Sequence, residues 1–232
     1  MAYYADMTSE SRLMPTVLHG HASDVILSLQ ALAPTLHEAL SLAIADAHAG
    51  ASGLLHERHP HVRPLLTRSH FRENLEAQHD LSGWGLGGDP RLMGQIYLVN
   101  TGLGLRLRFL KERRKSYPGG VPVAGRNPAR RAVWAGEEQL EIFHDDGCEL
   151  ASGMPHLLLL WDYLWGQNPH GLPGFTLRAV QPLAPGQYGQ AVPLGFSLDI
   201  SRNDTMFTSL VFPGAADDDN LFAEIDTEAN EA

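Results

Sequence analysis

The sequence has little cysteine and no long apolar run, and both scarcities limit the class of protein. Cys148 is the single cysteine, which excludes an internal disulfide and predicts a reducing compartment. The longest uninterrupted apolar run covers residues 157–161, whereas a membrane-spanning helix needs about 20 apolar residues. The first residues lack the basic and apolar segments of a secretory signal. We therefore expect a cytoplasmic protein that makes no contact with a membrane.

Familiar catalytic motifs are also missing. There is no GxxxxGK[ST] loop for nucleotide phosphates, and the glycine-rich residues 83–88 do not follow a predicted strand, as a dinucleotide fingerprint requires. A PD-(D/E)xK nuclease needs a carboxylate two residues before a lysine, but Phe109 and Arg113 hold these positions before Lys111 and Lys115. We therefore expect no cofactor and no catalytic residue of these classes.

Two polar clusters leave open an enzymatic alternative, a metal-dependent hydrolase. Residues 56–61 (HERHPH) offer nitrogen and oxygen ligands for zinc, but their spacing is not HExxH and Pro60 interrupts a helix. Residues 144–148 (HDDGC) combine a thiol, a histidine and two carboxylates, yet Asp-Asp-Gly is also an ordinary turn. We interpret both clusters as loops and assign no metal ligand.

Charge is distributed very unevenly along the chain, whose formal net charge is -10. Between residues 106 and 131, nine basic residues face one acid, Glu112, which gives +8. The other eight basic residues face 26 acids, which gives -18. An anionic partner would therefore be attracted to this one segment. Its basic residues are Arg106, Arg108, Lys111, Arg113, Arg114, Lys115, Arg126, Arg130 and Arg131.

Hydrophobic periodicity predicts helices in the first third of the chain. Apolar residues at helical spacing follow Ser23, a residue type that caps helices, and continue to about Ala49. Pro34 interrupts this pattern, so we expect one kinked helix or two short ones. After the loop-like residues 49–64, a further helix is predicted from Ser69 to Asp80.

The pattern then changes to that of strands. Residues 95–100 and 105–110 predict a hairpin around the turn 101–104, and residues 83–90 predict a loop. In the second strand Arg106 and Arg108 alternate with apolar residues, so we expect a cationic face turned toward solvent. Asn127 and Pro128 predict the start of a helix that carries Arg130 and Arg131. Further strands are expected at residues 140–143, 156–163, 175–180 and 194–200.

These elements predict an α+β protein with N-terminal helices packed on a mostly antiparallel sheet of four to six strands, with a basic β-hairpin. Residues 1–22 are expected to form a loose arm and residues 23–212 a single domain. Residues 213–232 carry seven acids and no basic residue, which predicts a mobile acidic tail.

Several segments resemble a family of functionally uncharacterised proteins from high-GC bacteria. They are IYLVNTGLGLRLRFLKE, VPVAGRNPARRAVW, HLLLLWDYLW, FTLRAVQPL and LQALAP, with the stretch PxxGRxxxRRxxW at residues 122–134 the most specific. The resemblance covers roughly residues 23–200, and it carries over no catalytic role because none is established for the family. Genes of that family often sit beside helix-turn-helix regulators or ImmA/IrrE-type metallopeptidases in mobile elements, which implies a partner of that kind.

The sequence thus predicts a non-enzymatic regulatory or interaction protein whose nine basic residues bind DNA or an acidic partner protein. Arginines along a strand and a helix could follow phosphates and release counterions from DNA. They could equally pair with the chain's own acids, and this alternative stays open. In a winged-helix variant, residues 69–80 would be the recognition helix and residues 95–110 the wing, although Glu73 and Glu76 would repel phosphates.

Overall fold

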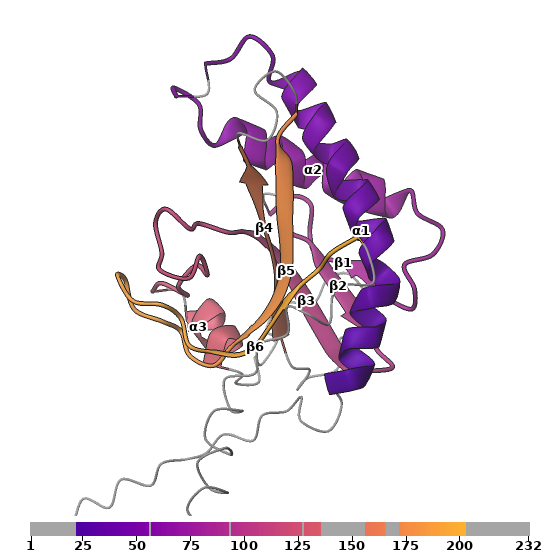
Figure 1. Cartoon of the computed structure of the whole chain (residues 1–232), viewed down its shortest axis with the longest axis vertical. Coiled ribbons are helices and arrows are strands. Elements are labelled where there is room, and N and C mark those ends of the chain that lie inside the picture. Colours follow the sequence, from indigo (N-terminus) through magenta and orange to yellow (C-terminus); the bar gives the residue numbers. More distant parts are fainter. Residues whose placement is uncertain are drawn as a thin grey trace, which may run out of the picture.

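Six strands form one mixed sheet in the computed structural model (Figure 1), which describes residues 22–55, 57–92, 94–126, 128–135, 156–165 and 172–202. The strands lie in chain order across the sheet, and all neighbours are antiparallel except the parallel pair β3 and β4. Their bounds are β1 (Gly85–Gly87), β2 (Tyr97–Asn100), β3 (Leu105–Lys111), β4 (His156–Leu164), β5 (Gly174–Pro182) and β6 (Leu194–Asp199). The predicted α+β class and mostly antiparallel sheet are confirmed.

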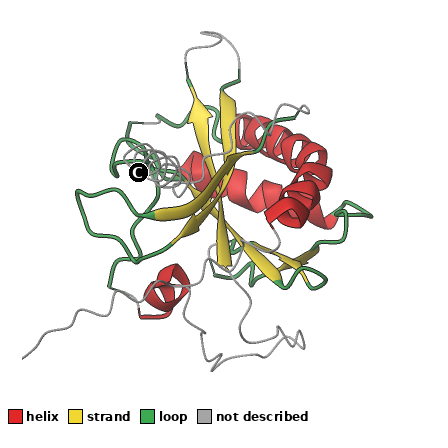
Figure 2. Ribbon diagram, turned by 60° about the horizontal axis from the view of Figure 1, so that its bottom comes forward, coloured by secondary structure: helices red, strands yellow, loops and turns green. Residues whose placement is uncertain are grey.

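Helices cover both faces of this sheet. The long helices α1 (Ala22–Gly50) and α2 (Val62–Glu76) lie on one face, and the short α3 (Pro128–Ala135) lies on the other (Figures 1 and 2). β4 is buried on both sides, because Leu157 and Leu159 join the core under α1 while Leu158 and Leu160 join the smaller core beside α3. This explains its unbroken apolar sequence, which is typical of a central strand.

The first helix runs without interruption through Pro34. Eleven of its residues are buried, on both sides of the proline, so one packed face supports the helix where the proline removes a backbone hydrogen bond. The expectation of two short helices is therefore wrong. By length and hydropathy alone α1 could also cross a membrane. Its apolar residues are accounted for here by burial against α2 and the sheet.

The second helix begins at Val62, well before the predicted start at Ser69, and ends at Glu76. Pro64 had suggested a loop, but it lies in the first helical turn, where a missing N–H costs nothing. Phe71 and Leu75 are buried, and Thr67 Oγ1 lies 2.9 Å from Tyr163 Oη of β4. These contacts fix α2 on the sheet.

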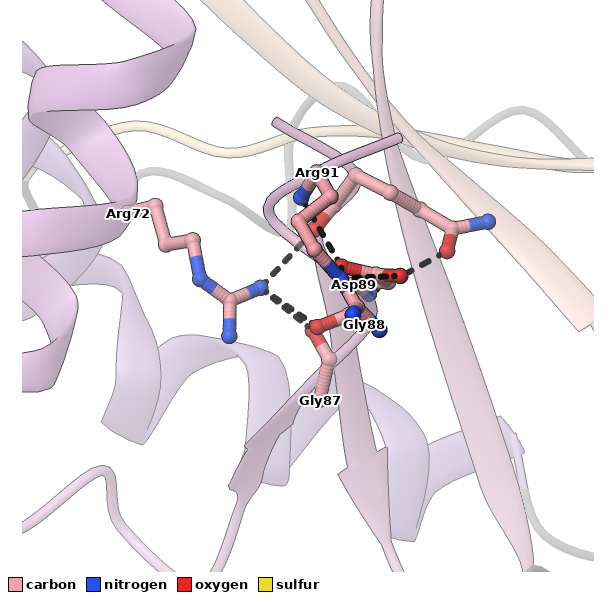
Figure 3. A network of polar contacts seen from close by, with 6 residues as sticks. Arg72, Gly87, Gly88, Asp89 and Arg91 are labelled. Carbon is pink, nitrogen blue, oxygen red and sulfur yellow. Dashed lines mark hydrogen bonds and ion pairs between the residues drawn. The ribbon is translucent and has the colours of Figure 1, made fainter. Parts of the chain in front are cut away.

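Arg72 joins α2 to the turn between β1 and β2 (Figure 3). Its Nη1 donates to the carbonyls of Gly87, Gly88 and Gln95 at 3.2, 2.8 and 2.9 Å, and its Nε donates to Glu76. Gly88 has a φ of 95°, and a Cβ there would lie 2.7 Å from the Gln95 carbonyl oxygen. The sequence did not predict β1. In the winged-helix variant Arg72 would contact DNA, but here its guanidinium group is already bonded to these carbonyls and to Glu76.

The other predicted elements are largely confirmed. β2 and β3 pair as the hairpin expected from the turn at residues 101–104, and β4, β5 and β6 lie close to the strands expected at residues 156–163, 175–180 and 194–200. α3 begins at Pro128 as predicted, while the capping Asn127 lies outside the described residues. The expected strand 140–143, most of the N-terminal arm and the acidic tail also lie outside them. The proposed domain limits stay predictions.

Candidate anion-binding surface

The nine basic residues predicted to bind a partner differ in solvent exposure: four are buried or half-buried, and five are exposed. Arg106 is buried, with 7 % of its surface exposed, and Arg108, Lys111 and Arg130 are half-buried. The other five are exposed on the loop after β3 and on α3, and we call them the outer basic surface. They are Arg113, Arg114, Lys115, Arg126 and Arg131. The expected solvent-facing stripe on the strand is wrong at Arg106, because this face of the sheet is also covered.

Arg106 and Arg108 lie on the α3 side of the sheet beside Tyr97 and His156. Antiparallel pairing places Tyr97 opposite Arg108, and parallel pairing places His156 next to Arg106. The Cζ atoms of Arg106 and Arg108 lie 5.4 and 5.6 Å from the centre of the Tyr97 ring, within the range of cation–π attraction. We call these four residues the inner arginine cluster.

Burial and like charges control protonation in the inner arginine cluster. Burial lowers the pKa of Arg108, the Tyr97 phenol raises it, and Arg130 lowers it further. Burial, together with Arg106 and Arg108, lowers the pKa of His156 to about 4, so its ring is neutral at pH 7. No carboxylate of the described residues is among the groups that shift these two pKa values. The cluster therefore joins two guanidinium cations to a neutral imidazole.

Lys111 belongs to neither group, because internal partners hold its ammonium. It forms an ion pair with Asp162 of β4. Its Nζ also lies 5.3 and 5.1 Å from the ring centres of Trp161 and Tyr163. Lys111 therefore helps to join β3 to β4 and is a poor candidate for binding a partner.

One buried carboxylate holds the loop after β3 against the sheet. The side chain of Glu112 is 0 % exposed and accepts hydrogen bonds from Arg178 of β5 and from Arg114, the latter at 3.0 Å. The Arg113 N–H donates to the Gly120 carbonyl at 2.9 Å and closes the loop. A Cβ on Gly120 would lie 2.8 Å from Cγ of Glu112, and its φ of 80° also favours glycine. Residues 113–116 are thus presented on a fixed turn.

α3 is fixed by its tryptophan. Trp134 is fully buried and its indole N–H donates to the Pro122 carbonyl at 2.9 Å. The Cζ atom of Arg130 lies 6.0 Å from the centre of its ring, which gives this arginine a packing role. Arg131, the next residue, is exposed. Of the two arginines in α3, Arg130 therefore packs near Trp134 and Arg131 is exposed to solvent.

Four cations of the outer basic surface, Arg113, Lys115, Arg126 and Arg131, form no ion pair with a carboxylate of the described residues.

Exposed apolar and aromatic groups lie beside these cations. Tyr188 is 72 % exposed, its ring centre lies 6.1 Å from that of Tyr117, and its hydroxyl lies beside Gly125. The loop that carries Tyr188 is joined to the loop after β3 by a hydrogen bond from the Ala124 N–H to the Pro185 carbonyl at 2.8 Å. The surface thus combines arginine with tyrosine.

The sequence did not point to Tyr97, His156 or Tyr188. Tyr97 could have been found, because a four-residue turn at 101–104 fixes the register that sets it opposite Arg108. His156 and Tyr188 reach their places through a parallel strand pair and a contact between distant loops. Local sequence carries no signal for contacts of this kind.

The hydrolase alternative gains no support from the part of the chain that the structure describes. Glu57, His59 and His61 are exposed between α1 and α2, with the two imidazole centres 6.4 Å apart. Among the described residues no three histidine, cysteine or acidic side chains are grouped to hold a metal ion. His56 and residues 144–148 lie outside them.

Comparisons of the chain with protein-family models, curated proteins and solved structures give no match. The resemblance to proteins encoded beside regulators therefore stays a prediction.

Proposed function

We propose that the protein is a non-enzymatic interaction protein whose outer basic surface binds an acidic, carboxylate-rich segment of a partner protein. The observation that carries this proposal is the set of four exposed cations that lack a carboxylate partner within the described residues. The buried Glu112 and Trp134 hold their loop and helix in place. A fixed surface loses less conformational entropy when a partner binds.

The residues beside these cations favour a protein as the binding partner over DNA. Protein interfaces are enriched in tyrosine and arginine, and binding energy concentrates in such residues. Here Tyr188 and Tyr117 lie beside the loop that carries the arginines, and Leu183, in the same loop as Tyr188, is 47 % exposed. DNA would also meet the repulsion of a chain that is strongly acidic outside this segment. DNA is the alternative that the experiment has to exclude.

The partner class follows from the chemistry of the surface and from the resemblance noted in the sequence. An acidic face of a regulatory protein, such as a helix-turn-helix regulator or an ImmA/IrrE-type protease, would supply the carboxylates. The role of the protein would then be to dock on that regulator in the cytoplasm and change its activity.

The proposal can be tested with two defined probes, a fluorescent peptide rich in glutamate and aspartate and a fluorescent DNA duplex. We expect the peptide to bind at physiological salt. Each of two double variants, Arg113→Gln with Lys115→Gln and Arg126→Gln with Arg131→Gln, should weaken binding about tenfold, because each removes two charge-assisted contacts. Fluorescence anisotropy measures both affinities.

The matched control removes the same charge elsewhere, through Arg58→Gln with Arg91→Gln, two exposed arginines distant in sequence from this surface. This variant should bind the peptide like the wild type. Tighter binding to the duplex than to the peptide would replace the proposal by DNA binding. Failure to bind either probe, or equal loss in the control, would overturn it.

A further inference from the structure

The outer basic surface has an anionic counterpart in the same chain. Residues 217–226 (DDDNLFAEID) carry five acids and no basic residue, and residues 217–219 are the only run of three acids in the sequence. This segment lies outside the described residues, so its sequence is what describes it. The cations that pair with no acid in the described part of the chain are Arg113, Lys115, Arg126 and Arg131.

The charge of the remaining chain directs this segment to the same surface. Outside residues 106–131 and 213–232, the sequence has eight basic residues and 19 acids. An acidic segment is therefore repelled by most of the molecule and attracted by the outer basic surface. Residues 137–146 also hold five acids, but no more than two of these are adjacent, so their charge is less concentrated.

The apolar residues of the segment match the surface as well. Leu221 and Phe222 follow the three aspartates after one asparagine. On the surface, Tyr188 is 72 % exposed beside Tyr117, and Leu183 is 47 % exposed in the same loop as Tyr188. This loop lies beside α3 and shares its small hydrophobic core (Figure 1). Burial of apolar groups here adds to the attraction between the charges.

The chain between β6 and the segment is long enough to reach the surface. The described chain ends two residues after Ile200, whose N–H donates to the Leu177 carbonyl of β5 at 2.8 Å. The next residue of β5, Arg178, donates to the Gly119 carbonyl in the loop after β3. Residues 203–216 extend to about 45 Å, which exceeds this short path. A tether of this length holds the segment at an effective concentration of about 1 mM.

We propose that residues 217–226 occupy the outer basic surface of their own molecule when no partner is bound, and compete with the partner for the same cations. The inference rests on the proposed function, because it needs this surface to bind carboxylates. If the segment itself binds with a dissociation constant of about 0.25 mM, competition weakens partner binding about fivefold. The surface then selects partners whose acidic segments bind more tightly than its own.

Carbodiimide cross-linking of the full chain tests the contact, because it joins an amine to a carboxylate only where the two touch. The chain has two lysines, Lys111 and Lys115. Lys111 pairs with Asp162 and is the internal control, whereas Lys115 belongs to the outer basic surface. Trypsin releases residues 203–232 as one peptide, because no basic residue follows Arg202. We expect mass spectrometry to find this peptide joined to Lys115.

A matched variant shows whether the surface holds the segment. Arg126→Gln with Arg131→Gln leaves Lys115 intact and should lower its cross-link severalfold, while the product of Lys111 with Asp162 keeps its yield. A Lys115 that joins residues 137–146, or no acid at all, would overturn the inference. So would a product that joins isotope-labelled to unlabelled molecules, because the segment would then bind a second copy.

Peptide affinity separates this inference from the proposed function. Asparagine at all three positions 217–219 should strengthen binding of the glutamate- and aspartate-rich peptide about fivefold in fluorescence anisotropy, because the tethered competitor is weakened. The matched control removes three exposed acids elsewhere and should change little; its substitutions are Glu38→Gln, Asp46→Asn and Glu57→Gln. If the wild type and the asparagine variant bind the peptide equally well, the inference fails and the proposed function stands. If neither binds it, the proposed function fails and the inference with it.

Discussion

At the scale of single residues, burial and partners decide which charges can serve a ligand. Lys111 and Arg114 carry the same formal charge as Lys115 and Arg113, yet Asp162 and Glu112 hold the first pair. Exposed ion pairs contribute little, whereas a buried carboxylate such as Glu112 needs its partners. The residues that distinguish these roles are therefore the acids and not the arginines.

His156 predicts a pH dependence of stability. Its pKa is about 4 in the folded protein because of burial, Arg106 and Arg108, and near 6.5 when unfolded. Between these values the unfolded chain binds more protons, so stability falls as the pH drops from 6.5 toward 4, by up to about 3 kcal/mol.

Urea unfolding at several pH values in phosphate-free buffer measures this loss. His156→Gln should flatten the pH profile. His37, whose pKa burial also lowers, should keep a smaller slope in the same direction. An unchanged profile in His156→Gln would show that this ring does not titrate as expected.

At the scale of elements, short segments depend on contacts that their own sequence does not encode. β1 has three residues, two of them glycine, and no strand pattern of its own. It forms because β2 pairs with it and Arg72 of α2 binds the carbonyls of the following turn (Figure 3). α2 likewise begins where Pro64 fits the first turn, not where a serine offers a cap.

Arg72→Met should destabilise the contact between α2 and the turn that follows β1. The substitution keeps the apolar stem but leaves three carbonyls without their donor, which should cost about 2 kcal/mol of unfolding free energy. Urea unfolding measures the loss, and hydrogen exchange should become faster mainly in β1 and β2. Arg91→Met, at a side chain that is 81 % exposed, is the control and should change little. Equal effects of both substitutions would contradict this role of Arg72.

At the scale of the whole molecule, β4 joins two hydrophobic cores. Its odd-numbered leucines, Leu157 and Leu159, pack under α1 and α2, and its even-numbered ones, Leu158 and Leu160, pack toward α3. Neither core can lose this strand without exposing the other. The two layers should therefore unfold together.

Leu158→Ala and Leu159→Ala test this coupling from opposite faces. Both side chains are 0 % exposed, so each substitution should lower the unfolding free energy by about 3 kcal/mol. Circular dichroism and tryptophan fluorescence should follow one coincident urea transition in both variants. Two separate transitions in Leu158→Ala would show that the α3 side unfolds independently.

The sequence by itself determined the elements whose pattern is local. Alternation located β3, a continuous apolar run located β4, the glycine turn located the β2–β3 hairpin, and Pro128 located the start of α3. The α+β class followed from their order, because periodicity depends on which side of each element is buried. The uneven distribution of charge along the chain located the cationic segment that carries every residue of the outer basic surface.

Only the tertiary structure decided which of those cations are free to act. Burial of Arg106, the partners of Lys111 and the approach of His156 and Tyr188 depend on pairing between residues far apart in the chain. A charge has the same formal value in any surroundings. Its free energy depends on the water and the opposite charges around it, and folding alone determines these.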